Sequence, residues 1–195
     1  MARDSFLWIK DSGTKFEGES NDDFCPKWIE LHSFSISSSQ AIGAAQSTAG
    51  GRTGERCDIS DLSISKDLDK TSPYLFKWCS DGEHLPKVVI RCFRSIGDPG
   101  EAAGGGKTGK QCYQTIVLKD ALISSYSISG GAGIPMESVT FNPGAVIVNY
   151  IPTSHLGGEA GKDESGGQVP ASWSLINNVA DADTSDADSG SGAVS

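Results

Sequence analysis

Short apolar runs, rich in β-branched and aromatic residues, recur along the chain, and glycines and small polar residues separate them; this pattern limits the possible folds more than any other. Such runs are typical of β-strands, and we expect roughly seven or eight of them. They begin with SFLWIK at residues 5–10 and KWIELHSFSIS at residues 27–37. Because helical patterns do not alternate with these runs, a doubly wound α/β fold is excluded and an antiparallel barrel or sandwich is favoured.

The second of these runs changes the phase of its alternation part-way along. Ile29 and Leu31 share one face, whereas Phe34 and Ile36 continue in the opposite phase. A slip of this kind is what a β-bulge produces, and curved sheets and barrels use bulges. We expect similar interruptions at two further places, between Ile59 and Leu62 and at Pro143-Gly144.

One helix is predicted, within DKTSPYLFKWCSDGEH at residues 69–84. Ser72 is a suitable N-cap, Pro73 suits the first helical position, and Gly82 suits the C-terminal stop. Because a helix this short is marginal in water, it must pack against the sheet to form. Three apolar residues are spaced to share its packed face: Leu75, Phe76 and Cys79.

The segment GEAAGGGKTGK, at residues 100–110, has the composition of a phosphate-binding loop. The spacing G-x-x-x-x-G-K-[ST] requires a glycine where Glu101 stands, and Gly100 lies one position too early. Such a loop must also open a helix, whereas KVVIRCFRSI before it and QCYQTIVLKD after it both indicate strands. We therefore predict a glycine-rich loop that joins two strands.

A second glycine-rich segment, residues 41–56, has almost no bulky apolar side chains. It cannot anchor itself in a hydrophobic core. We expect a long exposed loop or an extended hairpin there.

Net charge limits both the partners and the domain boundary. The chain carries a net charge of −9, which argues against nucleic acid as a partner because phosphate binding depends on Lys and Arg. From residue 159 onward there are seven acids and one base, which account for six of these nine charges. We expect one domain over residues 1–179 and a disordered acidic tail over residues 180–195.

The residues show no catalytic, metal-binding or cofactor-binding constellation. The five cysteines are widely spaced without a C-x-x-C pair, and we expect buried free thiols in a reducing compartment. His32, His84 and His155 are not at metal-ligand spacing from one another or from a cysteine. No serine has a histidine or an acid placed to activate it. We expect a protein that is not an enzyme and that needs no metal or cofactor.

Neither a signal peptide nor a membrane span is expected. The start, MARDSFLWIKDSG, lacks an apolar run of signal-peptide length, and no stretch approaches the length of a membrane span. We therefore expect no membrane insertion, and any export would use a route other than the general secretory pathway.

Several runs follow one another in an order that a known family shares. They are FLWIKDSGTKFEGES, WIELHSFSISSSQ, TIVLKDALISSYSISGG, ESVTFNPGAVIVNYIP and SWSLINN, with SKDLDKTSPYLFKWCSDGEHLP around the helix as the most specific part. Over most of residues 5–178 the chain resembles the Hcp family, the haemolysin co-regulated proteins that form the inner tube of the type VI secretion system. The resemblance implies a compact antiparallel β-barrel with one short side helix, similar to phage tail-tube proteins.

The resemblance also implies an assembly. Family members form hexameric rings that stack into a tube inside a contractile sheath. The implied partners are further copies of the chain, the sheath, the spike, and effectors that the ring lumen binds and chaperones. Assembly in the cytoplasm of a Gram-negative bacterium, and secretion of the tube to the extracellular space or a target cell, follow from the same resemblance.

Two sets of residues correspond to functional positions of the family. The lumen-lining position falls on Ser35, and Ser33 and Ser37 share its face through the period of two, so these serines are expected to face the channel. The extended ring-stacking loop falls on residues 41–56, where the expected contacts are Ala45, Gly50, Gly51, Arg52, Gly54 and Arg56.

Two alternatives remain open. A monomeric secreted effector or binding module, without enzymatic activity, predicts a chain that stays monomeric at micromolar concentration. An enzyme that binds a nucleotide through residues 104–108 predicts that ATP raises the melting temperature and that changing Lys107 to Ala abolishes an activity.

Overall fold

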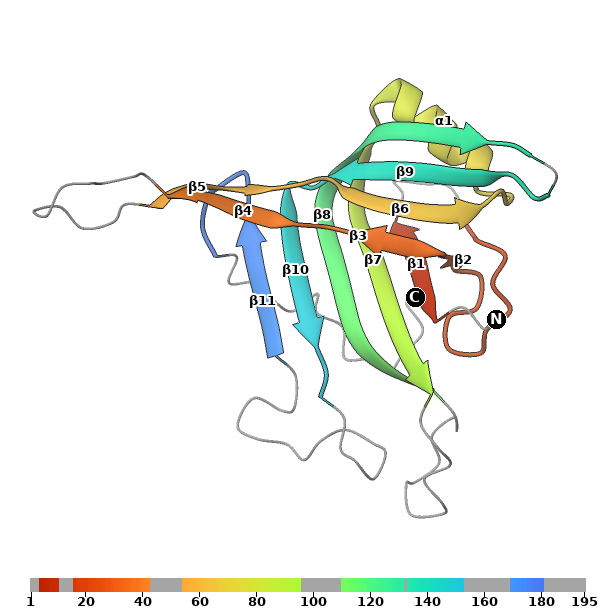
Figure 1. Cartoon of the computed structure of the whole chain (residues 1–195), viewed down its shortest axis with the longest axis horizontal. Coiled ribbons are helices and arrows are strands. Elements are labelled where there is room, and N and C mark those ends of the chain that lie inside the picture. Colours follow the sequence, from red (N-terminus) through yellow and green to blue (C-terminus); the bar gives the residue numbers. More distant parts are fainter. Residues whose placement is uncertain are drawn as a thin grey trace, which may run out of the picture.

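The computed structural model describes residues 4–10, 16–42, 54–95, 110–131, 133–152 and 169–180. Within these ranges the chain is mainly antiparallel β-sheet with one short helix, as predicted (Figure 1). The strands are β1 (Ser5–Lys10), β2 (Ile29–Glu30), β3 (Ser33–Ser35), β4 (Ser38–Ile42), β5 (Gly54–Ile59), β6 (Leu62–Asp67), β7 (His84–Ser95), β8 (Lys110–Ser129), β9 (Met136–Asn142), β10 (Ala145–Tyr150) and β11 (Val169–Ser174), and the helix is α1 (Ser72–Asp81).

The main sheet closes on itself through the segment that carries β2 and β3. The strand order is β2-β1-β7-β8-β9-β6-β3. Between β2 and β3, the Leu31 N–H donates to Ser5 O at 3.0 Å and the His32 N–H donates to Ser65 O at 2.8 Å. The segment therefore pairs with β1 at its start and with β6 at its end, and this change of partner is the predicted phase slip. The result is a barrel.

The long strand β8 belongs both to the barrel and to an extension of the sheet. Residues 114–119 of β8 pair with β10, and residues 122–129 pair with β9. Consequently β9 and β10 follow each other along β8 with only Pro143 and Gly144 between them. This confirms the predicted interruption, which forms a corner between the two strands. β11 then pairs with β10, and Figure 1 shows β10 beside β8 and β11 on the far side of β10.

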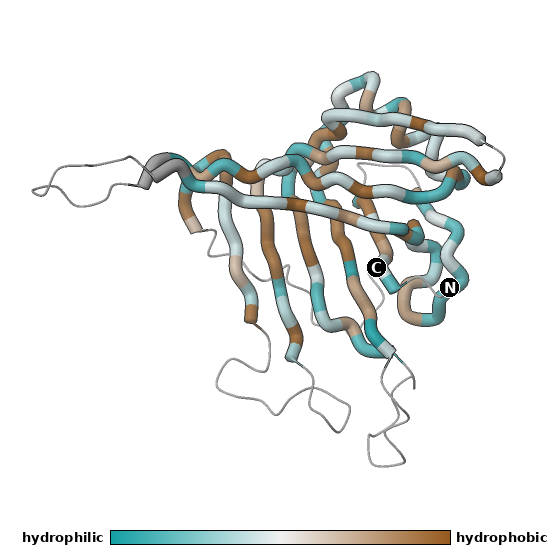
Figure 2. Tube along the Cα trace, in the orientation of Figure 1, coloured by the Kyte–Doolittle hydropathy of each residue, from teal (hydrophilic) through white to brown (hydrophobic). Residues whose placement is uncertain are grey.

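Buried apolar side chains cover both faces of β1 and β7. Leu7 and Ile90 belong to the core of the barrel, whereas Phe6 and Val89 pack on the other face against residues of the 24–28 segment. Figure 2 shows the hydrophobic residues gathered along β7, β8 and β10. A strand that is buried on both faces reads as a continuous apolar run, which explains the sequence KVVIRCF.

The helix α1 begins differently from the prediction. Its N-cap is Thr71, not Ser72, and no side chain caps it. The Ser72 hydroxyl accepts a hydrogen bond from the Asp69 N–H at 3.0 Å instead. Gly82 ends the helix at φ 66°, as predicted. The predicted packed face is wrong for Phe76, which is 59% exposed, because Trp78 lies on that face and is buried together with Leu75.

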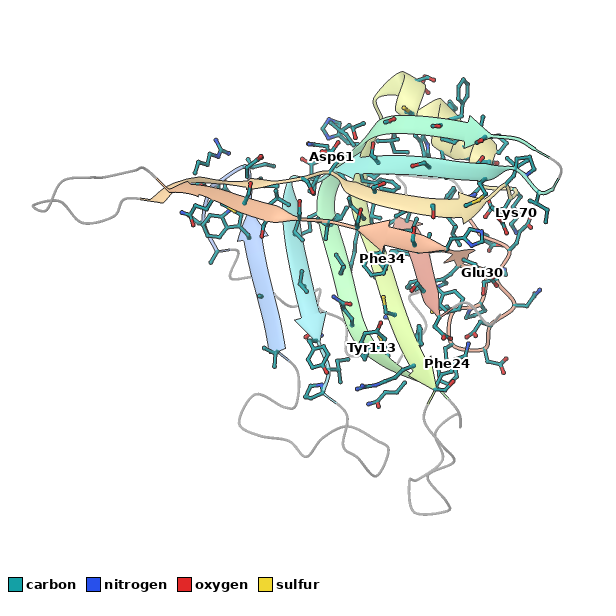
Figure 3. The ribbon with its side chains drawn as sticks, viewed as in Figure 1. Phe24, Glu30, Phe34, Asp61, Lys70 and Tyr113 are labelled. Carbon is teal, nitrogen blue, oxygen red and sulfur yellow. The ribbon has the colours of Figure 1, made fainter. Side chains whose placement is uncertain are left out.

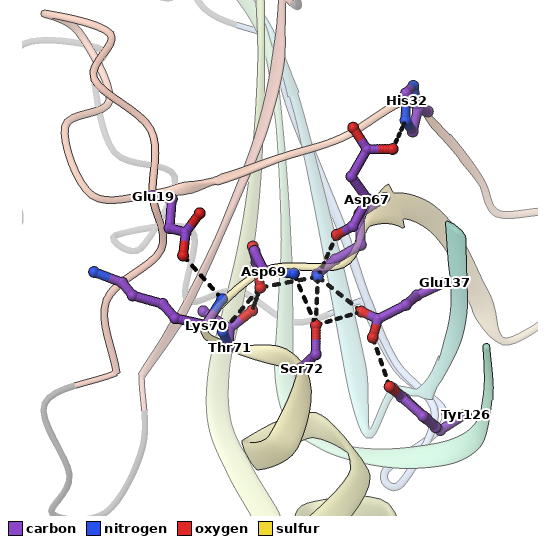
Figure 4. Close-up of polar contacts among 10 residues, drawn as sticks. Glu19, His32, Asp67, Asp69, Lys70, Thr71, Ser72, Tyr126 and Glu137 are labelled. Carbon is purple, nitrogen blue, oxygen red and sulfur yellow. Dashed lines mark hydrogen bonds and ion pairs between the residues drawn. The ribbon is translucent and has the colours of Figure 1, made fainter. Parts of the chain in front are cut away.

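A buried polar network holds the start of α1 against the barrel (Figure 4). Lys66 Nζ donates to Glu137 Oε2 at 2.8 Å and to Asp69 Oδ1 at 3.0 Å. The hydroxyl of Ser72 donates to Glu137 Oε2 at 2.8 Å, and that of Tyr126 donates to Glu137 Oε1 at 2.6 Å. Burial, together with the Glu137 carboxylate, raises the pKa of Tyr126. The network thus joins β6, β8, β9 and α1.

Two further expectations need correction. The eleven strands among the described residues exceed the predicted seven or eight because each interrupted run forms separate strands, including β5 and β6 on either side of residues 60–61. None of the five cysteines is in a disulfide, but only Cys25, Cys92 and Cys112 are buried. Cys57 and Cys79 are half-buried.

Candidate functional site

Alternation along β3 turns its serines outward. Ser33 and Ser35 are exposed, whereas Phe34 and the following Ile36 pack against the barrel core. Ser37, between β3 and β4, is exposed as well. The period-two pattern is therefore present as predicted; that these serines face a channel stays a prediction.

The outward serines of β3 are part of a wider surface, which we call the hydroxyl face. β3 pairs with β6, β6 with β9, and β9 with the second half of β8. Strand register places hydroxyl side chains opposite one another across all four strands. The two rows are Ser33, Ser65, Ser138 and Ser127, and Ser35, Ser63, Thr140 and Ser125.

Sequence reasoning missed the hydroxyl residues of β6, β8 and β9. A signal was present, because SIS, SSYSIS and SVT each place a hydroxyl at every second position. That signal identifies an outward face on each strand separately. Only the pairing of strands far apart in sequence shows that these faces join into one surface.

Neighbouring hydroxyl groups on this surface bind one another. Ser33 Oγ lies 2.8 Å from Ser65 Oγ, and Ser37 Oγ donates to Ser60 Oγ at 3.0 Å. Such groups both donate and accept hydrogen bonds without carrying charge. The two rows are therefore polar, uncharged and built from small side chains, and the exposed Met136 lies beyond them on β9.

Carboxylates stand at the two ends of β6 on the same face. Asp61, between β5 and β6 (Figure 3), accepts hydrogen bonds from Ser124 and, at 2.8 Å, from Asn142. Asp67 Oδ1 lies 2.7 Å from the Nε2 atom of His32. No Lys or Arg lies on this face among the strand residues that the structure describes.

The described ends of the 41–56 segment form an antiparallel hairpin. β4 pairs with β5 in a separate two-stranded sheet, and Figure 1 shows it projecting from the barrel. Arg56, on β5, donates a hydrogen bond to the carbonyl of Leu175. Gly54 opens β5, whereas Ala45, Gly50, Gly51 and Arg52 lie outside the described residues.

A groove of about 340 Å³ lies between the root of this hairpin and the β10–β11 pair. Apolar side chains dominate its lining. They come from β5 and the segment before β4 on one side and from β10 and β11 on the other: Ile36, Cys57, Ile59, Val146, Val148 and Trp173.

The remaining chemistry-bearing residues are dispersed over the fold. Lys107 lies outside the described residues, but β7 and β8 on either side of its loop pair with each other, as predicted for a loop between two strands. His84 pairs with Asp120 at 2.8 Å, and His155 lies outside the described residues. Burial raises the pKa of Cys25 to about 12, so its thiol is a poor nucleophile at neutral pH.

Within the ranges that the structure covers, no group of His, Cys, Asp and Glu residues is arranged to hold a metal ion. Over the same ranges, α1 is too short and too polar to span a bilayer, and no other helix is described.

Comparison with known proteins places the chain in a family. A family model described as "Type VI secretion system effector, Hcp" matches residues 6–150. The chain belongs to the Hcp family. Protein hcp1 of Pseudomonas aeruginosa is 33% identical over 126 residues, which cover 64% of this chain and 68% of that protein. Family membership places the chain among the tube proteins of the type VI secretion system, which are secreted and structural rather than enzymatic as a class.

Solved structures agree on the fold. One described as a type six secretion system protein has a TM-score of 0.73 at 23% identity and covers 92% of this chain and 100% of its own. Hcp1 from Salmonella typhimurium has a TM-score of 0.63 at 21% identity and covers 92% of this chain and 99% of its own. The barrel with one short helix is therefore the fold of Hcp structures.

Proposed function

We propose that this protein forms hexameric rings that stack into the inner tube of a type VI secretion system, with the hydroxyl face lining the channel. The observation that carries the proposal is the composition of that face: two rows of Ser and Thr cross four strands, and the carboxylates, Asn142 and the exposed Met136 lie only at the ends of these rows. Small neutral groups let varied cargo slide without adhering, whereas an apolar lining would retain it.

In this proposal the other predicted features have defined roles. Ser33, Ser35 and Ser37 face the effectors, which the ring holds before export. Residues 45–56 contact the next ring of the stack. The sheath surrounds the tube and the spike lies at its end. The rings assemble in the cytoplasm and are secreted to the extracellular space or a target cell, and the role is structural, without catalysis.

The oligomeric state tests the proposal directly. We expect light scattering on the purified protein to give a mass of about six subunits, because head-to-tail contacts close when the rotation permits. Negative-stain images of the same peak should show annular particles. A chain that stays monomeric at increasing concentration contradicts the ring and favours the monomeric secreted module.

The orientation of the hydroxyl face needs a separate measurement. In a background with Cys57 and Cys79 changed to Ser, Ser35→Cys is labelled with a small maleimide and with one carrying a long polyethylene glycol chain. We expect the small reagent to react fully and the large one at least about ten-fold more slowly, because a channel excludes bulky chains. The matched control is Lys77→Cys on the exposed face of α1. Equal rates at both positions in the intact ring would place the hydroxyl face outside the channel.

A further inference from the structure

The hairpin leaves the barrel at an irregularity in the strands. Ser35 pairs with Ser63 on β6, but Ser38 pairs with Ile59 on β5, so the register shifts by one residue between the two pairs. At this point the Ser37 N–H donates to Ser60 Oγ at 2.9 Å. The β5–β6 side therefore has one residue more than the β3–β4 side, and an extra residue of this kind bends a pair of strands. The barrel sheet therefore does not by itself set the direction of the hairpin.

Packing beneath the hairpin fixes only its root, where Ile36 and Ile59 pack against the barrel core. The groove between its root and the β10–β11 pair has a volume of about 340 Å³. Close-packed interiors hold few voids larger than a water molecule. Ile59 and Val148 line opposite sides of this groove rather than closing it.

One polar contact bridges from the hairpin to the β11 end of the molecule. The guanidinium of Arg56 donates to the carbonyl of Leu175, which follows β11. The two residues are 119 positions apart in the chain. A charged donor on a carbonyl is among the stronger hydrogen bonds in proteins.

The acceptor lies in a tightly held turn. The Leu175 N–H donates to Gly144 O at 2.9 Å, and the Ser174 N–H donates to Val179 O at 2.9 Å. The Asn177 N–H donates to Ser174 Oγ at 3.2 Å. A Cβ atom on Gly144 would lie 2.9 Å from Ile176 Cδ1, so this turn packs closely against the β9–β10 corner. These contacts hold the Leu175 carbonyl in a fixed position relative to the β9–β10 connection.

We propose that Arg56 is a positioning residue, which aims the β4–β5 hairpin at the neighbouring ring by binding the Leu175 carbonyl. The proposal rests on the proposed role of the hairpin in ring stacking. It assigns Arg56 to an intramolecular contact that orients the hairpin, rather than to a contact with the next ring. The direction of the hairpin then depends on the turn after β11, a part of the chain that contributes nothing to the hairpin's own strands.

Two variants test the hydrogen bond between Arg56 and Leu175, one on the donor side and one on the acceptor side. Arg56→Ala removes the donor. Ser174→Ala removes the side chain that holds the turn, while Arg56 stays in place. The matched control is Asp58→Ala, an exposed residue two positions along the same face of β5. Circular dichroism and light scattering on each variant establish that the fold and the oligomeric state are retained.

The first readout is amide hydrogen exchange of the purified assembly. We expect the β4 and β5 amides to exchange about five-fold faster in Arg56→Ala, because local opening of the hairpin then no longer breaks a charged hydrogen bond. In Ser174→Ala we expect a smaller increase in the same amides, because the turn that presents the Leu175 carbonyl loses one of its hydrogen bonds. The β7 and β8 amides should keep their wild-type rates, and Asp58→Ala should resemble the wild type throughout. Unchanged hairpin exchange in Arg56→Ala overturns the proposal.

The second readout is the length of stacked tubes in negative-stain images, which we expect both variants to shorten. Shorter tubes in Arg56→Ala with unchanged hairpin exchange would make Arg56 a direct ring contact and overturn the positioning role. Faster exchange with tubes of normal length would support the positioning role of Arg56 and contradict the stacking role of the hairpin. The two proposals therefore fail in distinguishable ways.

Discussion

Lys66 is a charged side chain with no solvent exposure, on a strand whose outward face carries hydroxyls. Its ammonium group is compensated by the Glu137 carboxylate, which is also buried, and by the oxygens of Asp69 and Ser72. A buried ion pair adds little net stability, but removing one partner leaves an uncompensated charge in a low dielectric. At the residue scale, we expect single changes at Lys66, Asp69 or Ser72 to destabilise the protein.

Changing Lys66 to Met tests the network. We expect Lys66→Met to lower the free energy of unfolding by about 3–5 kcal/mol, because the carboxylate of Glu137 loses its charged partner. Denaturant unfolding at a fixed protomer concentration measures the effect. In the matched control Lys77→Met, the exposed pair with Asp81 at 4.0 Å is lost, and the cost should stay below about 1 kcal/mol.

The double variant Lys66→Met/Glu137→Leu should recover much of the loss, since both charges are then absent. Equal effects of Lys66→Met and Lys77→Met would contradict the importance of the buried network.

At the scale of elements, α1 forms because the barrel supplies what a short helix lacks. Leu75 has no exposure and Trp78 is buried, with the ring centroids of Trp78 and Phe16 4.7 Å apart. Phe76 lies outside this contact, with its ring centroid 5.8 Å from that of Tyr126. The spacing of apolar residues alone did not distinguish Phe76 from Trp78, because α1 has aromatic residues on more than one side.

Alanine substitutions should distinguish the two sides of α1. We expect Leu75→Ala to destabilise the protein by about 2–5 kcal/mol through the cavity that it leaves. Phe76→Ala should cost less than about 1 kcal/mol, because its side chain is largely in solvent. The midpoints of denaturant unfolding measure both. A larger loss for Phe76→Ala would contradict the assignment of this side chain to the exposed side of α1.

At the scale of the whole molecule, the hydroxyl face and the β4–β5 hairpin lie next to each other. The hydroxyl face lies on β3, β6, β9 and the second half of β8, and the hairpin continues β3 and β6 beyond the barrel (Figure 1). The strands β3 and β6, which carry part of the proposed channel surface, therefore lead directly into β4 and β5, which carry the proposed stacking contact. We propose that residues 1–179 form this domain and that residues 180–195 are an acidic tail outside it.

The resemblance of several runs indicated the Hcp family. The sequence also predicted the class of the fold, a helix that stops at Gly82, and the interruptions near residues 31–34 and 60–61 and at Pro143-Gly144. These are local properties, since alternation, turn residues and caps act over a few positions. The outward direction of Ser33 and Ser35 followed from the same alternation. The N-cap at Thr71 did not, because the Ser72 hydroxyl bonds to Glu137, 65 positions away.

The sequence did not predict which serine-bearing strands lie side by side, or that Arg56 binds Leu175; both depend on the folded arrangement of the strands. Strand order and register depend on how all the apolar faces are buried together, and a sequence met alone does not specify that arrangement. Hydrogen bonds between residues that are 65 or 119 positions apart exist only after the chain has closed into the barrel.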